Sequence, residues 1–497
     1  MGLPEHQPAW IGIDVGTQSV RAALVGADGT LLGSGSAPLR SSRPRAGHHE
    51  QNPEDWWGGL GLATRAALAG AGGFALGGVA ICSTSGSVLL SDGDGRPRTA
   101  ALMYDDTRAL AQAARVRDAE LVSAGGHAQR GHPTSAVARL LWLLEHTAAG
   151  RPGGVRLTHC ADLLAGRLTG GVVATDESHA LKSGFDPELR RWRTELFDAV
   201  GVPASVLPDV VAPGSLLGRV SPAAARHTGL AAGTPVLAGM TDSCAGQIAA
   251  GALAPGSWSS VLGTTLALKG VCPSPIVDAA AGVYSHRHPD GAGWLAGGAS
   301  NVGAGELTRR FPGRDLSALD AAAACHEPAP AVLYPLGEPG ERFPFARPDA
   351  RPIVLGRLGD EAEEYAAVLQ GIGFVERLCL DRMRTLGAAV DGPLRLTGGG
   401  ARSDYWCQLR ADILGRSVRR PVRPEPAVGM AILASAGSGS VTDAAARMVR
   451  ADLELDPRAD RVGRFDDAYG RLRDELAARG YVVVEQGTSE ERCSEDV

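Results

Sequence analysis

The sequence predicts an α/β protein built from two related lobes. Residues 11–25 have the pattern of an apolar strand, a glycine turn with hydroxyl side chains, and a second apolar strand. Residues 257–269 repeat this pattern about half a chain later. Both turns combine glycine with threonine, so backbone N–H groups and a hydroxyl can bind a phosphate. Two such units favour two lobes that hold one nucleotide.

Length and composition are those of a globular protein. The chain has 497 residues, of which 44% are hydrophobic and 21% are charged, and this length allows roughly two to four domains. A net charge of −6 without a polybasic segment argues against nucleic acid as a partner. Two of the 49 Lys and Arg residues are lysines, Lys182 and Lys269, which we attribute to GC-rich coding rather than to function.

Cysteine usage and hydropathy predict a cytoplasmic protein. The eight cysteines form no CxxC pair and no His/Cys cluster at zinc spacing, which favours free thiols in a reducing compartment. Residues 1–8 lack the features of a secretory signal, and no run of 18 apolar residues could span a membrane. We therefore expect no membrane association, and a monomer or homodimer whose partners are small molecules.

Strands and helices are expected to alternate along the N-terminal half. Residues 31–39 continue the first hairpin as a third strand. Residues 52–55, Asn-Pro-Glu-Asp, have the capping side chain, proline and acids of a helix start. A short apolar strand at 79–82 leads into the polar segment 83–87, and a leucine-rich helix is expected at about 134–147.

The C-terminal half is expected to begin after an apolar strand at 235–237, with the lobe boundary at about 245–255. Its elements are the hairpin at 257–269, a long helix at about 360–386, a strand at 394–397 and helices at about 405–415 and 427–437. The last of these helices is rich in small residues, which indicates close packing against a neighbouring element.

Two aspartates at strand ends are the candidate catalytic groups. Asp14 ends the first strand, where a carboxylate can hold Mg²⁺ near a transferring phosphoryl group. Asp242 follows the strand at 235–237 and precedes an Ala/Gly-rich helix, a position from which it could deprotonate a sugar hydroxyl. Asp242 could also serve that helix simply as its N-cap.

Three glycine turns are candidates for nucleotide binding. Their residues are Gly16, Thr17 and Gln18 in the first turn, Gly263, Thr264 and Thr265 in the second, and Gly399, Gly400 and Ser403 in the third. The third turn follows a strand and opens a helix, where bare backbone suits a purine or ribose. The sequence contains no GxxxxGK[ST] pattern, which excludes a P-loop kinase.

The candidates for binding an acceptor molecule lie in two polar segments. Ser85 belongs to 83–87, and Asp106 and Arg108 lie shortly after it in the chain. Polyols need several fixed hydrogen-bond partners, which serine and aspartate supply. The alternative for Asp106 and Arg108 is a surface ion pair near a helix start.

Taken together, these motifs resemble the FGGY family of carbohydrate kinases, which have the actin-like (ribonuclease H-like) ATPase fold. The resemblance covers about residues 8–480. The matching motifs are Gly12–Thr17, Glu50–Trp57, Leu168–Gly170, Gly239–Gly246, Gly263–Thr265 and Gly398–Ser403.

The resemblance implies a domain division and residue roles. It implies an N-terminal lobe over 8–248, a C-terminal lobe over 249–483 and a polar tail over 484–497, with the active site between the lobes. Family members transfer the γ-phosphoryl group of ATP to a sugar or polyol hydroxyl. Asp242 matches the catalytic base, which would also lie near substrate and metal. Asp14 matches the carboxylate near Mg²⁺ and substrate.

One branch of the family is closest in sequence. Residues 260–269, 297–303, 334–336 and 340–344 resemble pentulose kinases of cyanobacteria and plant plastids, which implies D-ribulose as the acceptor. Xylulose kinases usually have Met-His-Gly where this chain has Thr84-Ser85-Gly86. The alternatives are a kinase for D-xylulose or another ketose or polyol, and a sensor that retained the fold without turnover.

Overall fold

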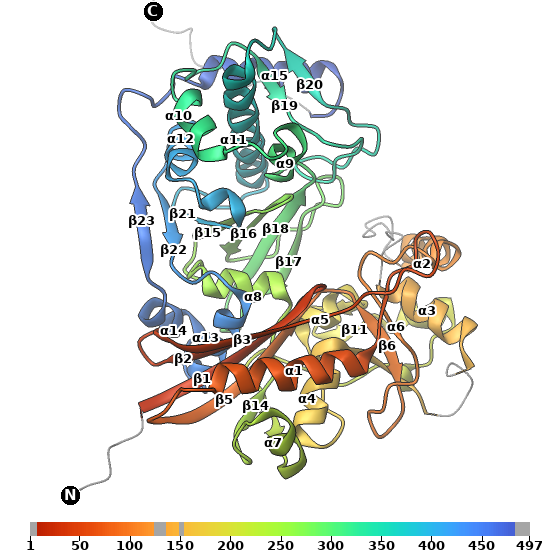
Figure 1. Ribbon diagram of the computed structural model, residues 1–497. Helices are drawn as coiled ribbons and strands as arrows, with labels where there is room; N and C mark the ends of the chain where they lie inside the picture. The colour runs from red at the N-terminus through yellow and green to blue at the C-terminus, as the bar shows by residue number, and fades with distance from the viewer. Residues whose placement is uncertain (1–6, 124–135, 149–153, 483–497) are drawn as a thin grey trace, which may run out of the picture.

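Two lobes form the molecule, each centred on its own β-sheet (Figure 1). The computed structural model describes residues 7–123, 136–148 and 154–482. The expected polar tail at 484–497 lies outside these residues. No helix in the described ranges is long and apolar enough to cross a membrane.

The N-terminal lobe contains a six-stranded sheet with the order β13-β14-β5-β1-β2-β3. β1 pairs in parallel with β5, and β5 pairs in parallel with β14, so the carboxyl ends of these three strands lie at one edge. Val15 at the end of β1 is level with Ser83, and Ser83 bridges Thr241 beyond β14. The strands are β1 Gln7–Val15, β2 Ser19–Gly26, β3 Leu31–Pro38, β5 Phe74–Ser83, β13 Leu216–Arg219 and β14 Pro235–Leu237.

Helices cover both faces of this sheet, because alternate residues of each strand point to opposite faces. On one face, Ile11 and Ile13 pack with α1, α4 and α7. The predicted cap of α1 is confirmed, since the Asn52 side chain accepts the Glu54 amide. The helices of this lobe are α1 Pro53–Leu68, α2 Leu110–Ser123, α3 Ala136–His146, α4 Cys160–Thr169, α5 Glu177–Lys182, α6 Thr194–Val200, α7 Pro222–Thr228 and α8 Asp242–Ala249.

A second, smaller sheet extends this lobe with the order β4-β7-β6-β8. It packs against α3, whose residues 136–146 match the expected helix; positions 134 and 135 lie outside the described residues. The short strands are β4 Glu50–Gln51, β6 Val88–Ser91, β7 Ala101–Leu102, β8 Arg156–His159, β9 Thr175–Asp176, β10 Phe185–Asp186, β11 Arg191–Trp192 and β12 Val210–Val211.

The C-terminal lobe contains a seven-stranded sheet with the order β17-β18-β16-β15-β21-β22-β23. β15 and β16 form the predicted second hairpin, and β15 runs parallel to β21. This pairing places the turn at 263–265 beside the glycines that follow β21. The strands of this sheet are β15 Trp258–Leu262, β16 Leu266–Cys272, β17 Tyr284–Arg287, β18 Trp294–Ser300, β21 Leu394–Thr397, β22 Val418–Pro421 and β23 Ala451–Leu455, while β19 Val332–Tyr334 and β20 Ile353–Leu355 pair separately.

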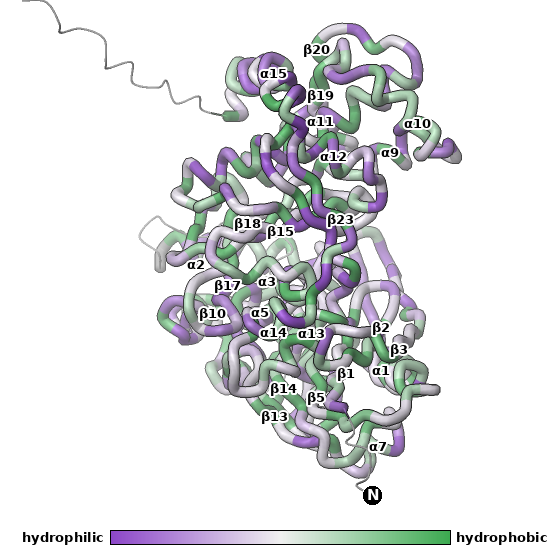
Figure 2. Tube along the Cα trace, turned by 90° about the vertical axis from the view of Figure 1, so that its left-hand side faces the viewer, coloured by the Kyte–Doolittle hydropathy of each residue, from purple (hydrophilic) through white to green (hydrophobic). Residues whose placement is uncertain are grey.

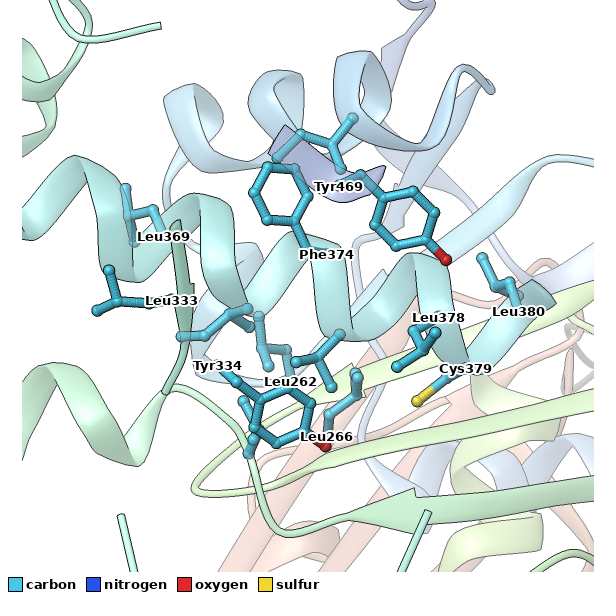
Figure 3. Packing of buried hydrophobic residues seen from close by; sticks show 14 of the residues in the cluster. Leu262, Leu266, Leu333, Tyr334, Leu369, Phe374, Leu378, Cys379, Leu380 and Tyr469 are labelled. Atoms are coloured by element: carbon cyan, nitrogen blue, oxygen red, sulfur yellow. The ribbon is translucent and has the colours of Figure 1, made fainter. Parts of the chain in front are cut away.

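The long helix α11 anchors the core of this lobe. Its apolar face, including Leu369 and Phe374, packs with Leu333, Tyr334 and Leu262 (Figure 3). The expected helices at 360–386 and 405–415 are confirmed within one residue. The helices of this lobe are α9 Gly305–Arg310, α10 Leu316–Ala323, α11 Glu361–Thr385, α12 Asp404–Leu414 and α15 Asp466–Ala478.

Two late helices, α13 Pro426–Ala436 and α14 Val441–Met448, join the N-terminal lobe: α13 packs against β1, β2 and β5, and α14 packs against α13 and α8. They lie beside β1 and β2, far from α10, α12 and α15 (Figure 2). The predicted close packing of the small-residue helix is confirmed, because a Cβ on Gly12 would lie 1.8 Å from the Ala427 carbonyl oxygen. The core of the first lobe thus includes residues beyond the predicted boundary at 248/249, which stays a prediction.

We expect Gly12→Ala to lower the free energy of unfolding by about 2 kcal/mol or more, because helix and strand must separate. Urea unfolding measures the change. Gly58→Ala is the matched control: Gly58 lies inside α1 with open space around its Cβ position, so alanine should leave stability equal or slightly higher. Equal stability of Gly12→Ala and wild type would contradict the close packing.

Candidate active site

Asp14 and Asp242 face the same edge of the N-terminal sheet. Asp14, near the end of β1, is 4% exposed, and Asp242 is the first residue of α8. Burial and the negative charge of Asp242 raise the pKa of Asp14 to about 6, against the lowering effect of Arg21. Burial also raises the pKa of Asp242, although the Ser243 amide, His179 and Lys269 oppose it. The two carboxylates therefore lie within electrostatic reach of each other.

Asp242 is not the N-cap of α8, so that alternative is wrong. Thr241 occupies the N-cap position, and the Asp242 side chain lies in the first turn. Its Oδ1 accepts the Ser243 amide at 2.7 Å. No donor among the described residues reaches Oδ2, so this oxygen is available to accept a proton or to bind a cation.

Arg21 joins this pair, although the sequence analysis did not select it. It is directly opposite Asp14 across the β1–β2 hairpin, and its Nη1 lies 3.6 Å from Asp14 Oδ2. About half of its side chain remains exposed, so the guanidinium can also meet a phosphate oxygen. The sequence could have indicated Arg21, because the predicted hairpin pairs this residue with Asp14 across the first turn.

The carboxylate pair is suited to a metal that brings other ligands. The described residues contain no cluster of three or more His, Cys, Asp or Glu side chains able to hold a metal ion. Mg²⁺ commonly uses one or two carboxylates together with water and substrate phosphate oxygens. Asp14 and Asp242 fit that mode, because a bound cation would offset the negative charge of Asp242 that helps to raise the pKa of Asp14.

The first two glycine turns project from equivalent hairpins. In the first, the Gln51 side chain donates to the Thr17 carbonyl oxygen at 2.7 Å. The Thr17 hydroxyl is a separate group, which is partly exposed and has no described partner. In the second, the Ala304 amide donates to the Gly263 carbonyl oxygen at 2.8 Å. A Cβ on Gly303 would lie 2.5 Å from the Thr264 carbonyl oxygen, so glycine is required behind this turn. Residues 16–18 and 263–265 are all partly or fully exposed, so both turns are accessible to a ligand.

The residues of the third turn differ in exposure and in hydrogen bonding. Gly399 is exposed, with open space at its Cβ position, whereas Gly400 is buried against Leu262. Ser403 caps α12: its Oγ accepts the Trp406 amide at 3.0 Å and donates to Asp320 Oδ2 at 2.6 Å. Gly399 can therefore approach a ligand, while the Ser403 hydroxyl already has two partners inside the protein.

Ser85 and the pair Asp106–Arg108 also differ in whether their polar atoms are free to bind an acceptor molecule. Ser85 follows β5, and its buried Oγ has no hydrogen-bond partner within the described structure. Asp106 is fully buried and accepts the His49 amide at 2.6 Å and Arg108 Nη2 at 2.7 Å. The ion pair expected as the alternative is thus present, but it is buried instead of lying at the surface. Arg108 also pairs with Glu50, so both groups bind within the protein.

A buried ion pair that the sequence analysis missed holds the site together. Asp176 and His179 of the α5 region meet at 2.5 Å, and His179 Nε2 lies 2.9 Å from the hydroxyl of Ser83 at the end of β5. The neighbouring Ser178 hydroxyl accepts the amide of Thr241 at 2.8 Å. Burial lowers the pKa of His179, but the Asp176 carboxylate outweighs it and raises that pKa to about 9.

We expect His179→Gln to reduce stability in a pH-dependent way. A raised histidine pKa stabilises the fold fully below the unfolded value near 6.5, and this stabilisation is lost as pH rises through about 9. At pH 7 the loss is expected to be roughly 3 kcal/mol, shrinking toward pH 10. Thermal or urea unfolding from pH 6 to 10 measures it, with His48→Gln as the control; an equal deficit at every pH would contradict the ion pair.

Comparison with known proteins agrees with this geometry. Residues 9–249 match the N-terminal domain, and residues 259–438 the C-terminal domain, of the FGGY family of carbohydrate kinases. Xylulose kinase of Streptomyces coelicolor is 30% identical over 94% of this chain and 95% of its own. The chain therefore belongs to the FGGY family of carbohydrate kinases, which are phosphotransferases.

Other relatives carry related names. Xylulose kinase of Bacillus subtilis is 26% identical over 92% of this chain and 94% of its own, and glycerol kinase of Ectopseudomonas mendocina is 28% identical over 87% and 91%. A solved structure described as a xyloylose kinase from Brucella ovis has a TM-score of 0.86 at 24% identity, over 95% of this chain and 99% of its own. The predicted two-lobed α/β fold is confirmed.

Proposed function

We propose that this protein is an ATP-dependent pentulose kinase that phosphorylates the terminal C5 hydroxyl, with D-ribulose as the preferred acceptor. The observation that carries the proposal is the pair of Asp14 and Asp242 at one sheet edge, with Asp242 Oδ2 free of described donors. One glycine turn from each lobe supplies amide and hydroxyl groups for the phosphates of ATP.

In this mechanism Asp242 is the catalytic base. The C5 hydroxyl gives its proton to Asp242, and its oxygen forms a bond to the γ-phosphorus. The bond from that phosphorus to the β–γ bridging oxygen breaks, and ADP leaves. When bound, Mg²⁺ supplies charge neutralisation on the phosphate oxygens. The protein's own contribution is mainly alignment and the placement of N–H groups and Arg21.

The choice of D-ribulose rests on sequence and on one side chain. Thr84-Ser85-Gly86 stands where xylulose kinases usually have Met-His-Gly, and the Ser85 hydroxyl has no described partner, so it can bind a sugar hydroxyl. D-xylulose is the second candidate, because curated relatives that match most of the chain are named xylulose kinase.

The proposal is tested by coupled ADP release with Mg²⁺ and ATP. The acceptors are D-ribulose, D-xylulose, L-ribulose, L-xylulose, D-erythrulose and glycerol. A kcat/KM for D-ribulose at least about tenfold above the others supports the proposal, since tenfold corresponds to 1.4 kcal/mol of discrimination. Preference for D-xylulose retains the kinase and rejects the acceptor. Sugar and ATP binding by calorimetry without ADP release would instead indicate a sensor.

We expect Asp242→Asn to reduce kcat by about 10²–10⁴-fold, because asparagine cannot accept the proton. Asp467→Asn, an exposed aspartate in α15, is the charge-matched control and should retain wild-type turnover. Steady-state kinetics at saturating ATP and acceptor measure both variants. Near-normal turnover by Asp242→Asn would reject Asp242 as the base.

A further inference from the structure

Both lysines of this arginine-rich chain lie where the two lobes meet. Lys182 ends α5 of the N-terminal lobe, and Lys269 belongs to β16 of the C-terminal lobe. Within residues 7–123, 136–148 and 154–482, no carboxylate lies within ion-pair distance of either ammonium group. GC-rich coding accounts for the scarcity of lysine, but it gives no reason for both exceptions to share one region.

Lys182 contacts the opposite lobe through an aromatic ring. Its Nζ lies 3.3 Å from the centre of the Tyr284 ring on β17, a cation–π contact. The positive charge of Lys182 lowers the pKa of Tyr284, against burial. This contact joins the lobes without touching α8.

Lys269 reaches the first turn of α8, directly beside Asp242. Its Nζ donates to Ser243 Oγ at 3.1 Å and lies 3.4 Å from Cys244 Sγ. In the described structure it is the one side chain of the C-terminal sheet that hydrogen-bonds this turn. A compact ammonium can donate to two neighbouring side chains, whereas the larger planar guanidinium requires a wider site.

The register of β16 connects Lys269 to the second phosphate turn. Leu266 and Leu268 are buried in the core of the C-terminal lobe, so Ala267 and Lys269 lie on the opposite face. Thr265 precedes Ala267 by the same two-residue step, at about 13 Å from Lys269 along the strand. β16 is paired on both sides, by β15 and β18, so backbone hydrogen bonds hold it in place between the turn and Lys269.

We propose that Lys269 is a positioning residue that couples the second phosphate turn to the catalytic base. Its ammonium holds the first turn of α8, so nucleotide bound at 263–265 fixes Asp242 relative to the transferring phosphoryl group. The inference rests on the proposed kinase function. It assigns to Lys269 no contact with substrate.

The expected signature is a loss of turnover without a loss of binding. Lys269→Met keeps the length of the side chain but removes the hydrogen bonds, and we expect kcat to fall roughly 10- to 100-fold, because alignment within about 1 Å governs transfer. KM values for ATP and acceptor should stay within about threefold. Lys269→Arg restores charge but not geometry, so it should recover less than half of the loss on a logarithmic scale.

Two controls separate a specific effect at α8 from a general effect of losing a lysine between the lobes. Lys182→Met removes the other lysine of the same region and should keep kcat within about threefold, since it leaves α8 untouched. Adding Ser243→Ala to Lys269→Met should cost almost nothing further, because the two residues act through one contact. A wild-type kcat for Lys269→Met, or equal losses for both lysine variants, would overturn the inference. A wild type inactive on every acceptor would instead reject the proposed function.

A second measurement does not depend on the acceptor. Hydrogen exchange of the α8 peptide, 242–249, is followed with and without Mg²⁺ and AMP-PNP, a non-hydrolysable ATP analogue. We expect the nucleotide to slow exchange in wild type and in Lys182→Met, but not in a Lys269→Met protein of equal thermal stability that still binds the analogue. Equal protection in all three proteins would overturn the coupling.

Discussion

Parallel pairing of β1, β5 and β14 is the constraint on which the candidate site depends. Parallel strands end at the same edge, so residues from three distant parts of the chain meet there: Asp14, the segment from Ser83 to Ser85, and Asp242. The same rule in the other lobe brings the turn after β15 beside the glycines after β21. Short-range sequence patterns therefore become one site through strand order alone.

The site carries an electrostatic cost that the surrounding structure offsets. Two acidic groups share a buried edge, and burial with like charge disfavours their ionisation. The buried pair of Asp176 and His179 places a positive charge nearby, and His179 also bonds to the Ser83 hydroxyl at the end of β5. Arg21 supplies a second positive charge from the adjacent strand. Such an arrangement suits a site that handles phosphate, metal and proton together.

Sequence analysis succeeded where a signal is local. The Asn52 cap, the hairpins, the long helix α11 and the strand-end aspartates all follow from spacing and residue type over a few positions. It missed Arg21 and the pair of Asp176 and His179, because their partners are fixed by register or by packing between distant segments. It also could not show that Asp106 and Arg108 bond to each other in a buried position. The roles of the two aspartates and of the three glycine turns remain predictions.

By itself, the sequence determined the fold class and the family and indicated the two candidate aspartates, since local periodicity and motif order encode them. Only the tertiary structure decided which polar atoms have partners: among the described residues none bonds to Ser85 Oγ or Asp242 Oδ2, whereas the Ser403 and Asp106 side chains are occupied. It also placed α13 on the first lobe and Lys269 on α8. Hydrogen-bond partners depend on three-dimensional proximity, which residue order specifies only through the complete fold.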